Sequence, residues 1–159
     1  MVRLQHGDHQ AYQALYERWG GQVMNFLLRR TGSRIRAEDA LQETWLRVFR
    51  YARSYQADRP FAPWLFRIAV RAGHDAYEPE PESFELAGSY EQQPELRDRV
   101  TRALHQLNAE DRRLLLLSVE GFDSTEIGGM LDQRPGTVRM RLTRIRRSLQ
   151  ESLQGDLDV

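Results

Sequence analysis

The segment from Phe122 to Leu149 constrains the fold of this chain most, because it holds two helical patterns on either side of a short turn. An α-helix advances about 100° per residue, so the side chains of the longer, second pattern can be placed around its axis. One face is apolar and the opposite arc is polar and basic. The apolar face holds Val138, Leu142, Ile145 and Leu149, and the basic arc holds Arg139, Met140, Thr143, Arg144 and Arg147. We expect the first face to be buried and the second to be exposed.

The residues before this helix predict how it is presented. Asp123 and Glu126 have the spacing of a capping box at the start of a short helix, and Pro135 suits the first position of the next helix. The small residues Gly128 and Gly129 permit a close approach between the two helices. The segment therefore predicts a helix-turn-helix.

A helix-turn-helix with a basic second helix is the arrangement that places a helix in the major groove of DNA. Between Arg134 and Arg147 there are six arginines and no acidic residue, which favours an anionic partner. The alternative is a basic helix that is only solvated, the commoner outcome for a run of like charges. The separation of apolar and basic faces favours DNA binding over that alternative.

Residues 1–77 predict a first helical domain. Apolar spacing predicts helices from Asp8 to Trp19, from Gln22 to Arg30 and from Arg34 to Tyr51. Gly20-Gly21 is expected to break or kink the chain between the first two of these helices.

The third of these helices has two contrasting sides. Leu41, Trp45, Val48 and Phe49 form a stripe expected in the core. An acidic edge lies opposite, formed by Asp39, Gln42 and Glu43. Such an edge is usually only solvated, but it can also pair with a basic protein partner.

Residues 50–63 predict a loop, and a further helix is expected to open at Pro63. Arginines alternate with aromatic residues through this part of the chain, a composition that stacks unpaired bases and follows phosphates. The residues concerned are Arg53, Tyr55, Phe61, Arg67 and Arg71. Aromatic residues near a helix start also fill cores, and the pattern alone leaves both interpretations open.

Residues 78–95 hold six glutamates, three prolines and no basic residue, the composition of a disordered acidic linker. Residues 96–154 then predict a second domain of four helices, ending in the helix-turn-helix, and residues 155–159 a tail. Asn108 is expected to cap the second of these helices. The expected fold class is all-α, with two small helical domains joined by an acidic flexible linker.

Several classes of function are excluded by what the 159 residues lack. The chain has no cysteine, and its four histidines show no metal-ligand spacing. It has no phosphate loop, nucleophile elbow or dinucleotide fingerprint. We therefore expect no catalytic site, no metal and no cofactor, and the chain is not expected to be an enzyme. The absence of a long apolar run or a signal peptide predicts a cytoplasmic protein without membrane insertion.

Three segments, in order, resemble a known family. AEDALQETWLRVF (37–49) is similar to the polymerase-binding helix of bacterial RNA polymerase sigma factors of the extracytoplasmic-function group. FAPWLFRIA (61–69) resembles the start of their promoter-melting helix, and GTVRMRLTRIRRSL (136–149) resembles their minus-thirty-five recognition helix. The likeness covers nearly all of the chain. It implies an alternative sigma factor that binds core RNA polymerase and directs promoter-specific initiation.

The resemblance also implies roles for residues. Asp39, Gln42, Glu43 and Trp45 would bind the clamp helices of the largest polymerase subunit. The second domain would lie by the flap on the upstream-DNA side. Minus-ten DNA would meet Arg53, Tyr55, Phe61, Arg67 and Arg71, and minus-thirty-five DNA would meet Arg139, Met140, Thr143, Arg144 and Arg147. The implied partners are core polymerase, promoter DNA and an anti-sigma factor.

The chain departs from the family pattern at the end of the melting helix. Family members usually continue with an asparagine and basic residues, whereas Arg71 is followed here by Asp75 and the acidic run. Met140 also replaces a usual small polar residue. Two alternatives therefore stay open: a degenerate sigma-like protein that binds an anti-sigma factor or core enzyme without melting a promoter, and a helix-turn-helix regulator of duplex DNA.

Overall fold

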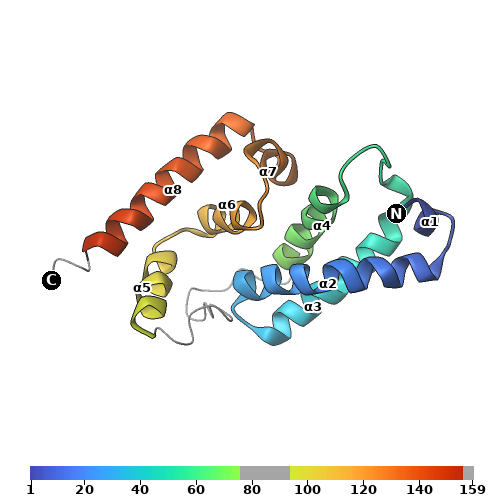
Figure 1. Cartoon of the computed structure of the whole chain (residues 1–159), viewed down its shortest axis with the longest axis horizontal. Coiled ribbons are helices and arrows are strands. Elements are labelled where there is room, and N and C mark those ends of the chain that lie inside the picture. The colour runs from blue at the N-terminus through green and yellow to red at the C-terminus, as the bar shows by residue number, and fades with distance from the viewer. Residues whose placement is uncertain (76–93, 156–159) are drawn as a thin grey trace. The chain divides into compact units, whose positions relative to one another are not determined.

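The computed structural model describes residues 1–75 and 94–155, and the secondary structure over these residues is helical (Figure 1). Contacts divide the chain into two compact units, Met1–Glu78 and Pro79–Val159. They are called the N-terminal unit and the C-terminal unit below, and each is described by itself. The all-α prediction is confirmed. The predicted linker lies outside the described residues except at its end, where a helix begins at Pro94.

The N-terminal unit is built on three long helices. Helix α2 packs against α3 and α4, and α3 packs against α4. Phe26 of α2 and Phe66 of α4 are fully buried and meet edge to face, with ring centroids 5.3 Å apart. The elements are α1 (Val2–Gln5), α2 (His9–Thr31), α3 (Arg34–Tyr51), the 3-10 helix η1 (Ala52–Ser54) and α4 (Phe61–Asp75).

Helix α2 runs unbroken through Gly20-Gly21, so the predicted break is wrong. Each glycine costs a helix about 1 kcal/mol relative to alanine. Packing outweighs this cost, because Val23, Phe26 and Leu27, one or two turns further on, are fully buried. The Asp8 carboxylate caps the helix as predicted, accepting from the backbone N–H groups of Gln10 and Ala11.

Helix α3 starts at Arg34 and is capped by the side chain of Ser33, immediately after Gly32 ends α2 in the left-handed conformation (φ 60°). Its buried stripe consists of Ala37, Ala40, Thr44, Trp45 and Val48. The predicted stripe was partly wrong, because Phe49 is 52% exposed and Leu41 is only half-buried. The small residues Ala37, Ala40 and Thr44 share the buried stripe with Trp45 and Val48, whereas Leu41 and Phe49 lie toward its margin.

The connection between α3 and α4 is shorter than predicted. Helix α3 continues to Tyr51, η1 follows directly, and α4 begins at Phe61 rather than at Pro63. Proline is compatible with this earlier start, because the first N–H groups of a helix have no intrahelical partner.

The C-terminal unit contains four helices over its described residues, in agreement with the predicted number. They are α5 (Pro94–His105), α6 (Ala109–Val119), α7 (Ser124–Leu131) and α8 (Pro135–Gly155). Helix α8 is the common partner, contacting α5, α6 and α7. The core between them is aliphatic and includes Leu114, Leu117, Ile127, Val138 and Ile145.

The helix-turn-helix is confirmed in its details. The side chain of Asp123 accepts from the backbone of Glu126, and the side chain of Glu126 accepts in return from the backbone of Asp123, which completes the capping box. Pro135 opens α8. Asn108 caps α6 by accepting from the Asp111 N–H at 2.8 Å.

The two glycines of α7 differ. A methyl group on Gly128 would lie 2.6 Å from the carbonyl oxygen of Gln133, so this residue allows the turn to fold back against the helix. The equivalent group on Gly129 would meet nothing within 4 Å. Only the first glycine therefore has the close approach that the sequence predicted for both.

Candidate functional sites

The basic arc of α8 is exposed, and the opposite face is buried except at Leu149, which is only half-buried. Val138, Leu142 and Ile145 are at most 5% exposed, whereas Arg139, Met140, Thr143, Arg144 and Arg147 all lie at the surface. Met140 is 76% exposed. The Thr143 hydroxyl donates to the Arg139 carbonyl at 3.0 Å, within the same helix. The helix thus presents Met140 and Thr143 between Arg139 and Arg144.

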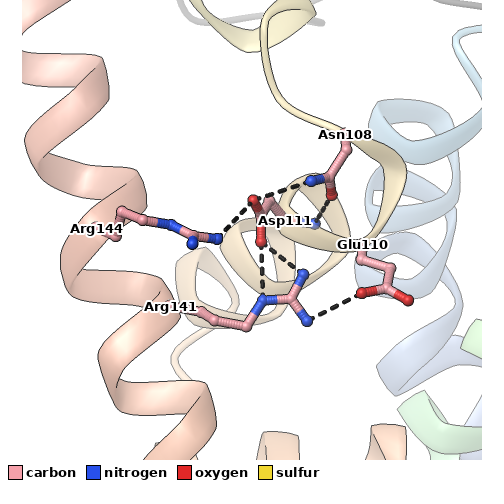
Figure 2. Close-up of polar contacts among 5 residues, drawn as sticks. All are labelled: Asn108, Glu110, Asp111, Arg141 and Arg144. Carbon is pink, nitrogen blue, oxygen red and sulfur yellow. Dashed lines mark hydrogen bonds and ion pairs between the residues drawn. The ribbon is translucent and has the colours of Figure 1, made fainter.

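A cluster of charged residues joins α8 to α6 (Figure 2). Asp111, in the first turn of α6, is a nearly buried carboxylate. Its Oδ1 accepts from Arg141 Nε at 3.0 Å and Nη2 at 2.7 Å. Its Oδ2 lies 3.4 Å from Arg144 Nη2 and 3.2 Å from Asn108 Nδ2. Arg141 also pairs with Glu110 at 3.0 Å.

Sequence reasoning missed this cluster. Arg141 counted only as part of a basic run, although its side chain is just 19% exposed. Burial by itself would lower the pKa of Arg141, but hydrogen bonds and charge from Asp111 and Glu110 outweigh it and raise the pKa above its ordinary value. The guanidinium is therefore permanently charged and compensated inside the unit. The signal in the sequence was the pair of acids in the first turn of α6.

The acidic edge of α3 borders a groove between α2 and α3. Asp39 and Gln42 are exposed, while Glu43 is half-buried and accepts from Arg47 Nε at 2.6 Å. The groove has a volume of about 380 Å³. It is lined by Tyr12, Tyr16, Glu38, Asp39, Leu41, Gln42, Trp45 and Leu46.

Trp45 is buried, as its place in the predicted core stripe requires, with only 2% of it exposed. Its assignment to polymerase binding stays a prediction. Its ring packs against Tyr12 and Tyr16, with centroids 5.8 and 5.1 Å away. Trp45 therefore supports the two tyrosines that line the groove, and little of its own surface is exposed. The sequence assigned no role to Leu46 and placed Phe49 in the core. Both side chains are more than half exposed on the same helix.

The aromatic residues near the start of α4 are packed against one another. The Tyr55 ring lies 5.9 Å from Phe61 and 5.3 Å from Trp64, and Phe61 lies 5.9 Å from Trp19. Tyr55 is 9% exposed and its hydroxyl donates to the Arg59 carbonyl. Tyr55 is therefore packed in the core of the unit, one of the two interpretations that the sequence left open, and its assignment to minus-ten DNA stays a prediction.

Of the remaining residues predicted around minus-ten DNA, Arg53 and Arg71 are exposed, and Phe61 and Arg67 are half-buried. Phe61 lines a groove of about 370 Å³ with Arg18, Trp19 and Tyr55. Arg67 and Arg71 are one turn apart on α4. These residues lie on two elements of one unit.

Metal and membrane sites are not found in the described parts of the chain. Within residues 1–75 and 94–155, no three side chains of the metal-binding types gather where an ion would be held. None of the helices described combines the length and apolar character that a membrane crossing requires.

Comparison with known proteins identifies the family. Residues 15–78 match the family model "Sigma-70 region 2", and residues 97–149 match "Sigma-70, region 4". The chain is 33% identical over 171 residues to the RNA polymerase sigma factor CarQ of Myxococcus xanthus, covering 100% of this chain and 98% of that one. The chain belongs to the sigma-70 family of RNA polymerase sigma factors.

The extracytoplasmic-function group is indicated by a second relative. The ECF RNA polymerase sigma-E factor of Escherichia coli K12 is 28% identical over 175 residues, covering 96% of this sigma factor and 91% of the relative. The fold agrees with two solved structures. CnrH, in complex with the cytosolic domain of CnrY, has a TM-score of 0.76 at 22% identity over 98% of this chain and 95% of that one. RpoE of Bartonella quintana, in complex with the anti-sigma factor NepR, has a TM-score of 0.72 at 20% identity over 91% and 98%.

This sigma factor is therefore a non-enzymatic protein that directs promoter-specific transcription initiation by RNA polymerase. The prediction from the three segments is confirmed. The duplex-DNA regulator alternative is wrong, because it leaves the region 2 match unexplained. The assignment to a sigma factor that directs initiation also replaces the degenerate sigma-like alternative. The acidic run that motivated this alternative lies largely outside the described residues.

Proposed function

We propose that the two units divide promoter recognition, with residues 96–154 reading duplex DNA at minus thirty-five and residues 1–77 binding core polymerase and minus-ten DNA. The observation that carries this proposal is the two-sided character of α8. Its apolar stripe is buried against α5, α6 and α7, so its basic arc is held outward. A helix fixed in this way on a compact support suits the major groove.

Base recognition is assigned to residues on the exposed arc. An arginine can form two hydrogen bonds with one guanine, and an apolar side chain can contact the thymine methyl group. Arg139 and Arg144 have the first property and Met140 the second. Arg147, further along α8, is suited to a phosphate. Thr143 completes the arc between them.

The core-binding surface is assigned to the α3 edge formed by Asp39, Gln42 and Glu43, with Leu46 and Phe49 beside it. The exposed apolar side chains add contact area to a charged edge, a combination typical of protein interfaces. Its partner would be the clamp helices of the largest polymerase subunit, and the C-terminal unit would lie by the flap.

Minus-ten DNA is assigned to Arg53, Phe61, Arg67 and Arg71, with Tyr55 supporting Phe61 from within the aromatic cluster. Partial exposure of Phe61 leaves part of its ring available for stacking. The protein would act in the cytoplasm. An anti-sigma factor is a further proposed partner, because a protein with the same fold was solved with one.

The experiment that tests the proposal is in vitro transcription with core polymerase of the native host on fragmented native DNA, with start sites mapped. We expect a set of promoters that share an upstream element. Asp39→Arg should weaken core binding in a pull-down, whereas Glu17→Arg, the same change at an exposed site of α2, should not. Arg139→Ala should weaken binding to the upstream element, whereas Arg34→Ala should not. Initiation that is unchanged by the α8 substitution would overturn the assignment of that helix.

A further inference from the structure

The contact between Asp111 and Arg144 suggests a role for a carboxylate that is nearly buried. Asp111 has a side chain that is 10% exposed, and it lies on α6, whereas Arg144 is 70% exposed on the basic arc of α8. The two residues are 33 positions apart in sequence, so their meeting depends on the packing of α6 against α8.

The two arginines that meet Asp111 are held to different degrees. Arg141 makes two short bonds to Oδ1 and a third contact to Glu110, and its side chain is 19% exposed. Arg144, three residues later, makes one longer contact to Oδ2. Figure 2 shows both guanidinium groups converging on the carboxylate from the same helix. Arg141 therefore fixes the position of the Asp111 carboxylate through Oδ1, and Oδ2 faces Arg144.

We propose that Asp111 is a positioning residue for base reading, which orients the guanidinium of Arg144 before DNA arrives. This inference rests on the proposed function of α8. Only Nη2 of Arg144 meets the carboxylate, so the other N–H donors of the guanidinium are left for a base edge. A long side chain loses rotamer freedom when it binds, and orienting it beforehand removes part of that cost.

Loss of this orientation should reduce discrimination between DNA sequences more than it reduces overall affinity for DNA. A base contact requires an oriented fork, whereas a phosphate contact requires only a nearby charge. Asp111→Asn keeps the shape of the side chain and removes its charge. Discrimination between the promoter duplex and a duplex with the upstream element altered should fall by about threefold to tenfold. Affinity for the altered duplex should not fall, because a negative charge has been removed near DNA.

The test uses holoenzyme assembled from the full chain and core polymerase, with fluorescent promoter duplexes identified by start-site mapping. Wild type is compared with Asp111→Asn, Arg144→Ala and the double variant. Asp98→Asn, the same change at an exposed site on α5, serves as the control. We expect a loss of discrimination in both single variants and no further loss in the double variant.

The possible outcomes distinguish a failure of the positioning role of Asp111 from a failure of the assignment of α8 to duplex DNA. If Arg144→Ala reduces discrimination and folded Asp111→Asn does not, the positioning role is overturned while the assignment of α8 stands. If Arg144→Ala has no effect, both are overturned. A purely structural role would lower the melting temperature of Asp111→Asn and leave discrimination unchanged at temperatures where it is folded.

A second measurement covers the case in which Asp111→Asn does not fold. Side-chain ¹⁵N relaxation of the wild-type protein without DNA reports the mobility of each arginine, with the Arg144 signal assigned through Arg144→Lys. We expect the Arg144 guanidinium to be more restricted than that of Arg139, which is exposed on the same arc. Equal mobility of the two groups would overturn the proposal.

Discussion

The two units of this sigma factor hold their charged residues in different ways. In the N-terminal unit, Arg34 pairs with Glu38 and Arg47 with Glu43, each within one helix. In the C-terminal unit, Asp111 of α6 joins Arg141 and Arg144 of α8. The cores differ too, because the first contains edge-to-face and tilted ring contacts around Phe66 and Trp45, and the second is aliphatic. In the N-terminal unit, ring contacts such as Phe26–Phe66 join one helix to another, whereas in the C-terminal unit an ion cluster adds to the aliphatic core in joining α8 to α6.

Phe66→Ala should have the largest effect, and it should fall on one unit. Removing a fully buried phenylalanine costs about 3–5 kcal/mol of unfolding free energy. All three tryptophans, Trp19, Trp45 and Trp64, lie in the N-terminal unit, so tryptophan fluorescence reports its unfolding alone. The fluorescence transition should move to lower denaturant, while the circular dichroism change of the C-terminal unit should stay in place. A single shifted transition seen by both probes would contradict this separation.

Asp111→Ala tests the ion cluster directly. It leaves Arg141 buried without its main partner, and breaking such a pair costs about 3 kcal/mol. The C-terminal transition in circular dichroism should therefore move, and the fluorescence transition should not. The matched change in the other unit is Glu38→Ala, which removes an exposed pair within one helix and should cost only about 0.3–0.5 kcal/mol. Equal losses in the two variants would remove the contrast between the units.

Gly128→Ala and Gly129→Ala form a matched pair on α7. The added methyl group at Gly128 would overlap the Gln133 carbonyl, and relief by backbone movement should cost about 1–3 kcal/mol. At Gly129 the same methyl group has space, and higher helix propensity should raise stability by up to about 1 kcal/mol. Chemical denaturation followed by circular dichroism measures both. Destabilisation of similar size at the two positions would show that the turn is not tightly packed.

Asp8 should contribute the smallest effect, and one that depends on pH. Hydrogen bonding from the Ala11 N–H, opposed in part by burial and aided by the charge of Arg3, lowers the pKa of Asp8 below its ordinary value. Its stabilising contribution is therefore complete above the ordinary pKa and is lost as the pH falls through the lowered one, from about pH 5 downward. The melting temperatures of wild type and Asp8→Asn should differ at pH 7, and the difference should shrink as the pH falls below the ordinary pKa of Asp8. A difference that does not change with pH would exclude this charge effect.

Features set within one helix could be predicted from the sequence. The buried stripe through Val138, Leu142 and Ile145, the capping box at Asp123 and the caps at Asp8 and Asn108 all depend on neighbours within a few residues. The three segments that resemble a family are likewise continuous in sequence, and they were sufficient to predict the fold and the function. The residue assignments to DNA and polymerase remain predictions.

Features set by packing between helices could not be predicted in the same way. The continuity of α2 across Gly20-Gly21 depends on the burial of Phe26 against α4. The exposure of Phe49 and the burial of Tyr55 depend on which neighbours reach them. Arg141 and Asp111 are 30 residues apart, and helical periodicity carries no information about a partner at that distance.

The internal pairing of Arg141 limits how many counterions α8 can displace from DNA. Helix α8 holds five arginines, but the charge of Arg141 is already balanced by Asp111 and Glu110. Each phosphate neutralised contributes about −0.9 to the slope of log affinity against log salt concentration. The remaining four arginines therefore allow this helix a slope no steeper than about −3.6. Binding by α8 should lose less affinity on addition of salt than the count of its basic residues suggests.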